Sequence, residues 1–402
     1  MTTHTIAIIG GGPAGATTAE HLAQGWGLKG AAAGAHRVLL FEEKIGWEKP
    51  CGGGLPQKAL KHYPFLAQAA SGGNLLHDAE FVAPTGTAMR LHLRTPMAVY
   101  SRATLDQLLL RRAEQAGAEV VTDRIVRLER TNTGWELGGR TKTYRADFVV
   151  LAAGARTRLR RILAPDFLPA DFTLTLGYYC PAASDLLRVQ FYDHFEGYAW
   201  AFPRPDHVSV GICGRAGRES MAGLRERLEL FMRTFGYTAD RSRIYSHLLP
   251  SLSTESWGGL RLAGHGWALA GDAAGLVDPV TGEGIYYAMR SGELLAGTLV
   301  EGLPELYPER VRNDFSTALA LGARLTRMFY CGEFLGAGIT TRMIEIGRHS
   351  RRVLEVTQDL VEGSQSYLGL IARLHMSLIG ALLESSVGRL RARFQLHHAT
   401  QG

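Results

Sequence analysis

The sequence predicts an α/β protein with a discontinuous parallel-sheet domain, an antiparallel-sheet domain and C-terminal helices. Three observations indicate this fold. A short apolar run near the N-terminus leads into clustered glycines, which is typical of a buried parallel strand followed by a helix. A second glycine cluster follows another apolar run about 260 residues later. Between them, residues from about 166 to 255 hold short alternating segments typical of antiparallel strands.

The N-terminal segment has the pattern of a Rossmann-type nucleotide site. The β-branched run Thr5–Ile9 leads directly into Gly10, Gly12 and Gly15, and then into the helix-forming stretch Ala16–Leu22. The first glycine permits the tight turn, the second lets the backbone approach a pyrophosphate, and the third lets helix and strand pack closely. The helix N-terminus then presents free N–H groups to the anion. A glycine-rich turn without a ligand is the alternative interpretation.

A second strand, Arg37–Phe41, ends at Glu42, which we expect to accept the ribose hydroxyls of the nucleotide. Glu42 comes 27 positions after Gly15, later than the roughly 20 that the motif predicts. We expect the glycine- and alanine-rich stretch Gly25–Ala35 to absorb the excess as a loop.

The downstream glycine cluster predicts a second contact with the same nucleotide. Asp272 follows Gly271 at the end of an apolar strand and would accept hydrogen bonds from a ribityl chain. Pro279 and Gly282 bend the chain toward a helix that begins near Gly284 and Ile285, and its N-terminus would face the flavin edge that carries negative charge when reduced. Alone, this pattern is an ordinary helix-entry turn. Paired with the N-terminal site, it predicts a long nucleotide, and we expect FAD.

The predicted domains are discontinuous along the chain. The nucleotide domain takes residues 1–70, 97–165 and 256–305, the antiparallel-sheet domain takes 71–96 and 166–255, and residues 306–402 are helical. A helix is expected over Arg102–Ala116, a buried strand over Asp147–Leu151, and antiparallel strands over Thr173–Tyr179, Leu187–Tyr192, Tyr198–Phe202 and Val208–Ile212.

Composition fits a cytoplasmic enzyme. The 402 residues are 46% hydrophobic and 20% charged, which suits a large core in two domains. No apolar run reaches the roughly 18 residues that span a bilayer. Four widely spaced cysteines contain no C-x-x-C pair, so neither zinc nor an iron–sulfur cluster is predicted. The net charge of +6 shows no basic run interleaved with aromatics, so nucleic acid is not expected. We expect a monomer.

Three strings together resemble the geranylgeranyl reductase family, within the flavoproteins shaped like p-hydroxybenzoate hydroxylase. They are Lys49-Pro-Cys-Gly-Gly-Gly-Leu-Pro56, Tyr198-Ala-Trp-Ala-Phe-Pro203 and Gly282-Glu-Gly-Ile-Tyr286. The resemblance spans roughly residues 4 to 300. It implies an FAD enzyme that saturates isolated C=C bonds of a geranylgeranyl or other polyprenyl chain, by hydride transfer from reduced flavin and protonation.

The resemblance also implies site residues. Tyr198 and Trp200 share a strand face and would line an apolar tunnel beside the flavin, where their rings shield developing positive charge. Cys51 is the expected proton donor, and Arg102 is expected near the pyrophosphate. The full set of expected cofactor contacts is Gly10, Gly12, Ala14, Gly15, Glu42, Glu43, Lys44, Cys51, Gly52, Gly53, Arg102, Ala153, Gly154, Gly271, Asp272, Pro279, Gly282, Gly284 and Ile285.

Alternatives stay open at several points. An aromatic stripe such as Tyr198, Trp200 and Phe202 is more often plain core than a substrate tunnel, and Cys51 is equally typical of an inert thiol. Because Ala153 stands where many relatives have aspartate, the electron donor is left open between NADPH, ferredoxin and a quinol. The rival functions are a flavin monooxygenase, a halogenase, for which no lysine lies near the Tyr-x-Trp string, an electron carrier to quinone, and a redox-silent use of FAD.

The C-terminal segment predicts peripheral contact with the inner face of a membrane, without insertion. Leu368–Leu383 is apolar, interrupted by Arg373 and His375, and precedes the basic cluster Arg389, Arg391 and Arg393. A helix of this kind suits a bilayer surface from which a lipid tail is taken up. A face packed on the flavin domain explains the pattern equally well.

Overall fold

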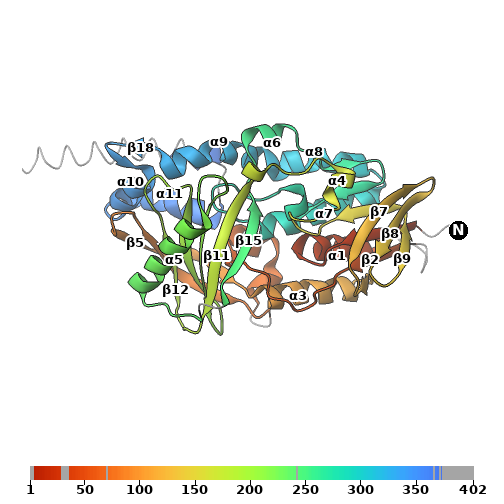
Figure 1. Ribbon diagram of the computed structural model, residues 1–402, viewed down its shortest axis with the longest axis horizontal. Helices are drawn as coiled ribbons and strands as arrows, with labels where there is room; N and C mark the ends of the chain where they lie inside the picture. The colour runs from red at the N-terminus through yellow and green to blue at the C-terminus, as the bar shows by residue number, and fades with distance from the viewer. Residues whose placement is uncertain are drawn as a thin grey trace, which may run out of the picture.

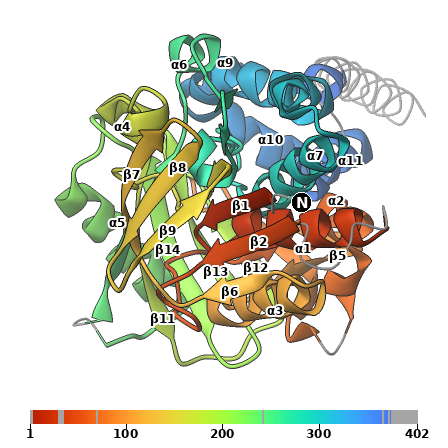
Figure 2. The same cartoon turned by 90° about the vertical axis from the view of Figure 1, so that its right-hand side faces the viewer.

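The computed structural model describes residues 4–28, 36–68, 71–240, 243–364, 367–370 and 373. The described chain forms two sheet-based halves side by side along the long axis, with C-terminal helices over both (Figure 1). Seen from the end that carries the N-terminus, the parallel strands lie in front of the long antiparallel strands (Figure 2).

The first half is built on a six-stranded sheet whose order is β16-β17-β10-β1-β2-β6. Except for the antiparallel edge strand β16, its strands run parallel. Its strands are β1 (His4–Ile9), β2 (His36–Phe41), β6 (Glu119–Val121), β10 (Phe148–Leu151), β16 (Ala263–Gly264) and β17 (Trp267–Leu269). The residues of β10 are buried throughout, which explains their continuous apolar run. The sequence predicted β1, β2 and β10 correctly.

The helices α1 (Pro13–Leu28), α3 (Arg102–Gln115) and α7 (Ile285–Glu301) pack on this sheet. A Cβ at Gly292 of α7 would lie 2.5 Å from the carbonyl oxygen of Ala14, so α1 and α7 touch backbone to backbone. A three-stranded sheet of β7 (Ile125–Thr131), β8 (Gly134–Gly139) and β9 (Thr143–Ala146), which the sequence analysis missed, lies at the N-terminal end of the molecule.

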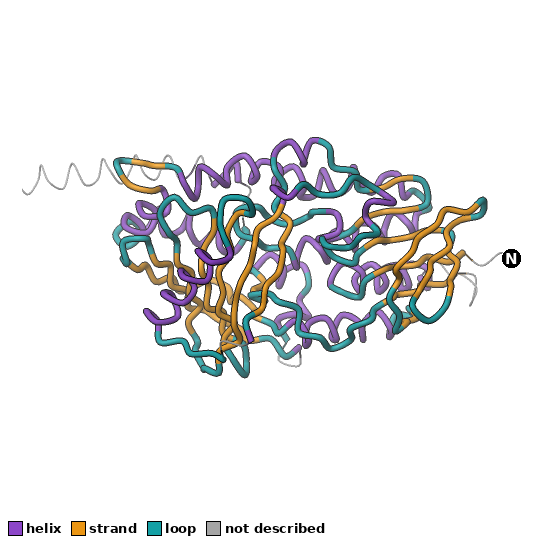
Figure 3. The backbone as a smooth tube through the Cα atoms, viewed as in Figure 1, coloured by secondary structure: helices purple, strands orange, loops and turns teal. Residues whose placement is uncertain are grey.

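The second half is an eight-stranded sheet of order β15-β11-β14-β13-β12-β4-β5-β3. Its long strands lie in the part of the molecule away from the N-terminus (Figure 3). Its pairs are antiparallel except β12 with β4. The strands are β3 (Gly54–Leu55), β4 (Asn74–Val82), β5 (Ala88–Val99), β11 (Phe172–Cys180), β12 (Leu186–Gln190), β13 (Gly197–Pro203), β14 (Val208–Arg215) and β15 (Tyr245–Pro250). The four antiparallel strands predicted between residues 173 and 212 are all present.

The remaining helices connect or cover the two halves. They are α2 (Gln57–His62), α4 (Arg160–Leu163), α5 (Met221–Phe235), α6 (Thr254–Gly258), α8 (Tyr307–Val311), α9 (Thr317–Cys331), α10 (Ile339–Gly347) and α11 (Arg351–Glu362). Buried residues of β4, β5 and β12 form one apolar cluster with buried residues of α9, α10 and α11.

Two expectations need correction. The stretch predicted as a loop from Gly25 is helical to Leu28, because Gly25 packs closely on Val300 of α7 and a Cβ there would lie 2.6 Å from that side chain. Residues 29–35 are outside the described chain. The helical run predicted after residue 306 is interrupted by the hairpin β18 (Glu333–Phe334) and β19 (Ala337–Gly338). Its turn, Leu335–Gly336, has φ values of +52° and +74°, as a two-residue hairpin turn requires.

Most of the predicted membrane-contact segment lies outside the described residues, including the arginines at 389, 391 and 393. Of its described part, Leu368 is exposed and Leu370 is buried. Within the described ranges, no helix combines the length and apolar character needed to cross a bilayer.

An ionic cluster fastens α11 to the antiparallel sheet. Arg94 of β5 donates hydrogen bonds to Glu362, at 2.7 Å, and to Asp359, which also binds Arg373. The carboxylate side chains of Asp359 and Glu362 are 6% and 3% exposed, so both depend on these cations. Burial raises the pKa of Asp359, but hydrogen bonds from Arg94, Arg373 and Ser364 outweigh it and hold the pKa below its ordinary value.

We therefore expect Arg94→Met to lower the free energy of unfolding by about 2 kcal/mol near pH 7, since it leaves buried carboxylates short of a charged partner. A carboxyl with a depressed folded pKa contributes stability above its unfolded pKa, and that stability is lost as pH falls through the folded value. The difference in free energy of unfolding between the wild-type protein and Arg94→Met, measured by urea titration, should thus become smaller toward pH 3. Arg351→Met, which breaks an exposed pair with Glu355 on the same helix, should cost less than about 0.5 kcal/mol. Equal losses for both variants, or a deficit independent of pH, would contradict this account.

Candidate active site

The N-terminal glycines divide into two kinds. Gly10 has φ of +106°, and a Cβ on Gly15 would lie 1.9 Å from the carbonyl oxygen of Gly10, so the fold itself requires both. A Cβ on Gly12 would meet only the guanidinium of Arg102, at 3.9 Å. Gly12 therefore leaves open space beside the N-terminus of α1, which is where the motif places a pyrophosphate.

The two glycine clusters meet in space. A Cβ on Gly271 would lie 2.8 Å from the side chain of Ala14, so the turn after β17 packs directly on the first turn of α1. The Gly271 amide also donates to Ser291 Oγ of α7 at 3.0 Å. Residues far apart in the chain thus form one continuous surface between α1 and α7. We call this surface the glycine cradle, and it consists of Gly10, Gly12, Ala14, Gly15, Gly271 and Asp272.

Glu42 directly follows β2 and holds the glycine loop in place through hydrogen bonds. Its two carboxylate oxygens accept hydrogen bonds from the backbone N–H groups of Gly11, at 2.8 Å, and Lys44, at 2.7 Å. Glu43 instead pairs with Arg124 and Arg140, and the Lys44 ammonium lies over the Trp47 ring. Ribose contacts by these residues stay a prediction.

Charged side chains line the path from the glycine loop toward the antiparallel sheet. Arg102, 4% exposed, donates to Asp106 at 3.1 Å, and Lys49 donates to Asp272 at 3.2 Å. Burial raises the pKa of Asp272, but the positive charges of Lys49 and Arg102 and the Lys49 hydrogen bond lower it below the ordinary value, so this carboxylate is ionised. Ala153 and Gly154 follow β10, and a Cβ on Gly154 would meet no atom within 4 Å.

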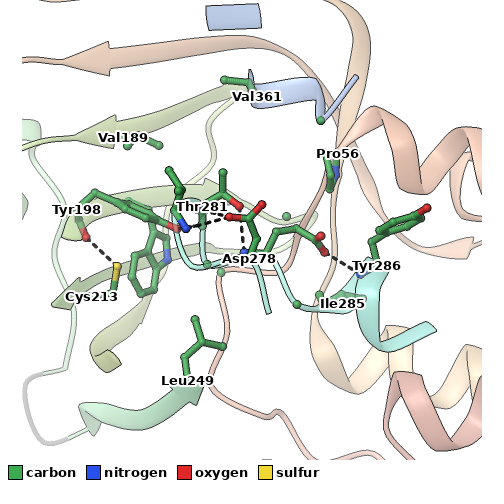
Figure 4. Close-up of a pocket in the computed structure, with 18 of the residues that line it drawn as sticks. Pro56, Val189, Tyr198, Cys213, Leu249, Asp278, Thr281, Ile285, Tyr286 and Val361 are labelled. Carbon is green, nitrogen blue, oxygen red and sulfur yellow. Dashed lines mark hydrogen bonds between the residues drawn. The ribbon is translucent and has the colours of Figure 1, made fainter. Parts of the chain in front are cut away.

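A cavity of about 520 Å³ lies between the two halves, next to this charged path. One side is the loop Pro50–Gly54 together with Asp278–Ile285 at the entry to α7. Figure 4 shows Tyr198 and Cys213 projecting from strands on one side, with Thr281 and Asp278 facing them. The far wall is apolar and comes from the second sheet and the C-terminal helices, with Phe81, Met97, Leu187, Val189, Phe191, Phe329, Leu360, Val361 and Leu370.

The sheet side of the cavity is two rows of side chains on one face of the sheet. The first row is Tyr198, Cys213, Thr175 and His247, which are register partners across β13, β14, β11 and β15. The second row is Trp200, Gly211, Gly177 and Tyr245. A Cβ on Gly211 would lie 2.2 Å from the Trp200 ring, and one on Gly177 would lie 2.3 Å from the Tyr245 ring. The two glycines thus leave room for the rings against this face of the sheet.

The predicted catalytic residues converge on this cavity. The Tyr198 hydroxyl donates to the Thr281 carbonyl at 2.5 Å, and Trp200 Nε1 is buried without a hydrogen-bond partner among the described residues. The Cys51 thiol accepts from Gly53 N–H at 3.3 Å. The backbone carbonyl of Cys51 accepts one hydrogen bond from Arg204, at 2.7 Å, and another from the Ser209 hydroxyl of β14. The loop carrying the thiol is therefore fixed against the sheet.

Of the expected residues, the structure brings these to the cavity: Cys51, Gly52, Gly53, Tyr198, Trp200, Gly282, Gly284 and Ile285. Gly10, Gly12, Ala14, Gly15, Gly271 and Asp272 form the neighbouring cradle. Pro279 packs away from the cavity, 3.3 Å from where a Cβ on Gly322 would lie. Their functional roles stay predictions.

Lys58, Tyr245 and His247 also line the cavity, although none of them was among the expected site residues. The alternation Tyr245-x-His247-x-Leu249, with all three on one face of β15, was an available signal. Lys58 is far from the Tyr-x-Trp string in the sequence and reaches the cavity from α2. Its ammonium pairs with Glu283 at 3.4 Å and donates to the Tyr287 hydroxyl at 2.6 Å.

These residues fit FAD. Gly12 leaves room where a pyrophosphate belongs, Glu42 stands at the end of the second strand, and Asp272 stands ionised between the cradle and the cavity. Within the part of the chain that is described, no cluster of histidine, cysteine and carboxylate side chains is arranged to hold a metal ion.

Comparison with known proteins agrees with this geometry. Residues 4–186 match the model of the pyridine nucleotide-disulphide oxidoreductase family. The chain is 27% identical over 327 residues to the chloroplastic geranylgeranyl diphosphate reductase of Oryza sativa subsp. japonica, covering 74% of this chain and 66% of the rice protein. The match thus spans slightly less than two thirds of that relative.

Two solved structures share the fold. A Thermoplasma acidophilum protein described as geranylgeranyl bacteriochlorophyll reductase-like superposes with a TM-score of 0.72 at 20% identity, over 94% of this chain and 100% of that one. A flavin-dependent brominase superposes with a TM-score of 0.70 at 17% identity, over 90% and 94%. The predicted fold class is confirmed.

Proposed function

We propose that this chain, a flavin-dependent oxidoreductase of the geranylgeranyl reductase family, saturates carbon–carbon double bonds of a polyprenyl chain held in the cavity. The observation that carries the proposal is the position of the apolar cavity. It opens directly on the loop of Cys51 and the entry to α7, the elements expected to hold the flavin ring. A hydrocarbon tail is the ligand that such walls suit best.

The walls perform two tasks in this proposal. Leu187 and Val189, alternate residues of β12, and Phe191, which directly follows that strand, line the cavity and bury the prenyl chain, which excludes water from the reacting bond. The ring faces of Tyr198 and Trp200 stabilise positive charge that develops on an unactivated alkene. When bound and reduced, FAD supplies the hydride.

The hydride adds to one carbon of the double bond, and the other carbon receives a proton. The Cys51 thiol, which lies on the cavity wall, donates that proton. Burial raises the pKa of the Cys213 thiol to about 12 and that of Tyr198 well above its usual value, so these neighbours hold their protons at neutral pH. NADPH, ferredoxin or a quinol is the proposed source of electrons.

The test is anaerobic incubation of dithionite-reduced holoprotein with geranylgeraniol and with geranylgeranyl diphosphate, followed by mass spectrometry. We expect products heavier by two hydrogens for each double bond reduced. The brominase of similar fold and the cavity lysine Lys58 make a halogenase the second candidate. Products that contain oxygen or bromine after aerobic incubation with NADPH and bromide, and no hydrogen gain, would support that candidate instead.

Cys51→Ser should retain FAD but slow the prenyl-dependent reoxidation of reduced enzyme about a hundredfold, the scale of a lost general acid, because a hydroxyl is a weaker acid than a thiol. Stopped-flow absorbance of the flavin measures this rate. Cys331→Ser, a half-buried thiol that does not line the cavity, is the matched control and should react at the wild-type rate. Unchanged reoxidation in Cys51→Ser would remove this thiol from the mechanism.

A further inference from the structure

The cavity wall includes a histidine that has no role in the function proposed above. His247 belongs to the first row of the sheet face, with Tyr198, Cys213 and Thr175. The hydroxyl of Tyr198 donates to Thr281, the thiol of Cys213 donates to the Tyr198 carbonyl, and the hydroxyl of Thr175 donates to the His247 carbonyl. The Nε2 atom of His247 is buried and has no partner among the described residues.

A buried polar nitrogen without a partner costs free energy, so such an atom in a cavity indicates a bound partner. A prenyl chain cannot be that partner, because a hydrocarbon offers no hydrogen-bond acceptor or donor. An isoalloxazine ring carries both carbonyl oxygens and ring nitrogens. The chemistry of the open atom thus fits the cofactor and not the tail of the substrate.

The surroundings of His247 also place it on the cofactor side of the cavity. Its charged neighbours include Lys49, Asp272 and Arg102, the side chains that line the path from the glycine cradle. Burial and the positive charges of Lys49, Arg102 and Arg156 lower the pKa of His247 to about 4, against the opposing effect of Asp272. The imidazole is therefore neutral at pH 7, and a neutral ring carries one N–H donor.

We propose that His247 hydrogen-bonds the flavin ring of bound FAD through Nε2 and stabilises the reduced form over the oxidised form. The inference rests on FAD binding and on no particular substrate. A donor aimed at the ring binds more strongly when the ring gains electron density, as a fixed dipole does at any site of developing charge. His247 is thus a cofactor-contacting residue that adjusts the reduction potential.

The test compares His247→Leu with His247→Gln in FAD-loaded protein. The leucine variant removes the N–H, and we expect it to weaken binding of reduced FAD about tenfold relative to oxidised FAD. For a two-electron couple that ratio is a fall of about 30 mV in midpoint potential. We also expect a shifted visible spectrum of the oxidised flavin. Glutamine keeps a side-chain N–H, so His247→Gln should have a midpoint potential and a visible spectrum close to those of the wild-type protein.

His265→Leu is the control, because His265 lies away from the cavity, against Arg130 near the three-stranded sheet. It should leave the spectrum and the potential unchanged. An unaltered potential and spectrum in a fully FAD-loaded His247→Leu protein would overturn the proposal. So would a change confined to the affinity for prenyl compounds, because that would place Nε2 against the substrate. These readouts need no turnover, so a failure of the prenyl-reductase proposal would leave them intact.

Discussion

Gly12→Val is expected to give a folded, colourless protein. A Cβ at this position would meet no protein atom closer than the Arg102 guanidinium at 3.9 Å, so the backbone accepts a Cβ here without a steric conflict. The methyl groups would occupy the space beside the N-terminus of α1 that the pyrophosphate needs. We expect FAD affinity to fall by at least about a hundredfold, as judged by flavin fluorescence and bound absorbance.

Gly15→Val is the matched contrast within the same motif. Its Cβ would lie 1.9 Å from the Gly10 carbonyl oxygen, so the strand–helix junction must shift and the protein itself should be destabilised. Circular dichroism and thermal unfolding separate the two outcomes. A yellow Gly12→Val protein with normal FAD content would mean that the nucleotide does not pass this glycine.

The nucleotide half was predictable because its signals are local. The run Thr5–Ile9 is apolar along its length, and the glycines that follow occur at the spacing that a strand–turn–helix junction demands. The same reasoning failed at Gly25, where glycine was interpreted as loop. Close contact with Val300 from a distant helix decides that conformation, and no local pattern encodes it.

The cavity was only partly predictable, because it is assembled from register and not from motifs. Tyr198 and Trp200 were found through a recognisable string. Their row partners Thr175, His247 and Tyr245 come from strands whose pairing the sequence does not state. Gly211 lies within the predicted strand Val208–Ile212. In the fold it makes room for the Trp200 ring, and this can be seen only once β13 and β14 are aligned.

The competing interpretation of the aromatic stripe as plain core leads to the last prediction, on Val189. This residue lines the cavity from β12, directly opposite Trp200 in the strand register. If the space holds a prenyl chain, Val189→Phe should fill part of the 520 Å³ without strain. FAD content and the free energy of unfolding should stay near the wild-type values, while reduction of a geranylgeranyl substrate should fall on the order of a hundredfold, as expected when a reacting bond is displaced by about an ångström or more.

If the stripe is instead packed core, the larger side chain should cost about 1–3 kcal/mol through overpacking. Urea unfolding and prenyl reduction assays on the same preparation distinguish the two cases. Val126→Phe, on the exposed strand β7, controls for the substitution itself and should change neither quantity. Loss of stability with unimpaired reduction of geranylgeraniol would show that the chain binds elsewhere. Loss of reduction at full stability would place the hydrocarbon beside Val189 in the cavity, because the added ring would occupy that space.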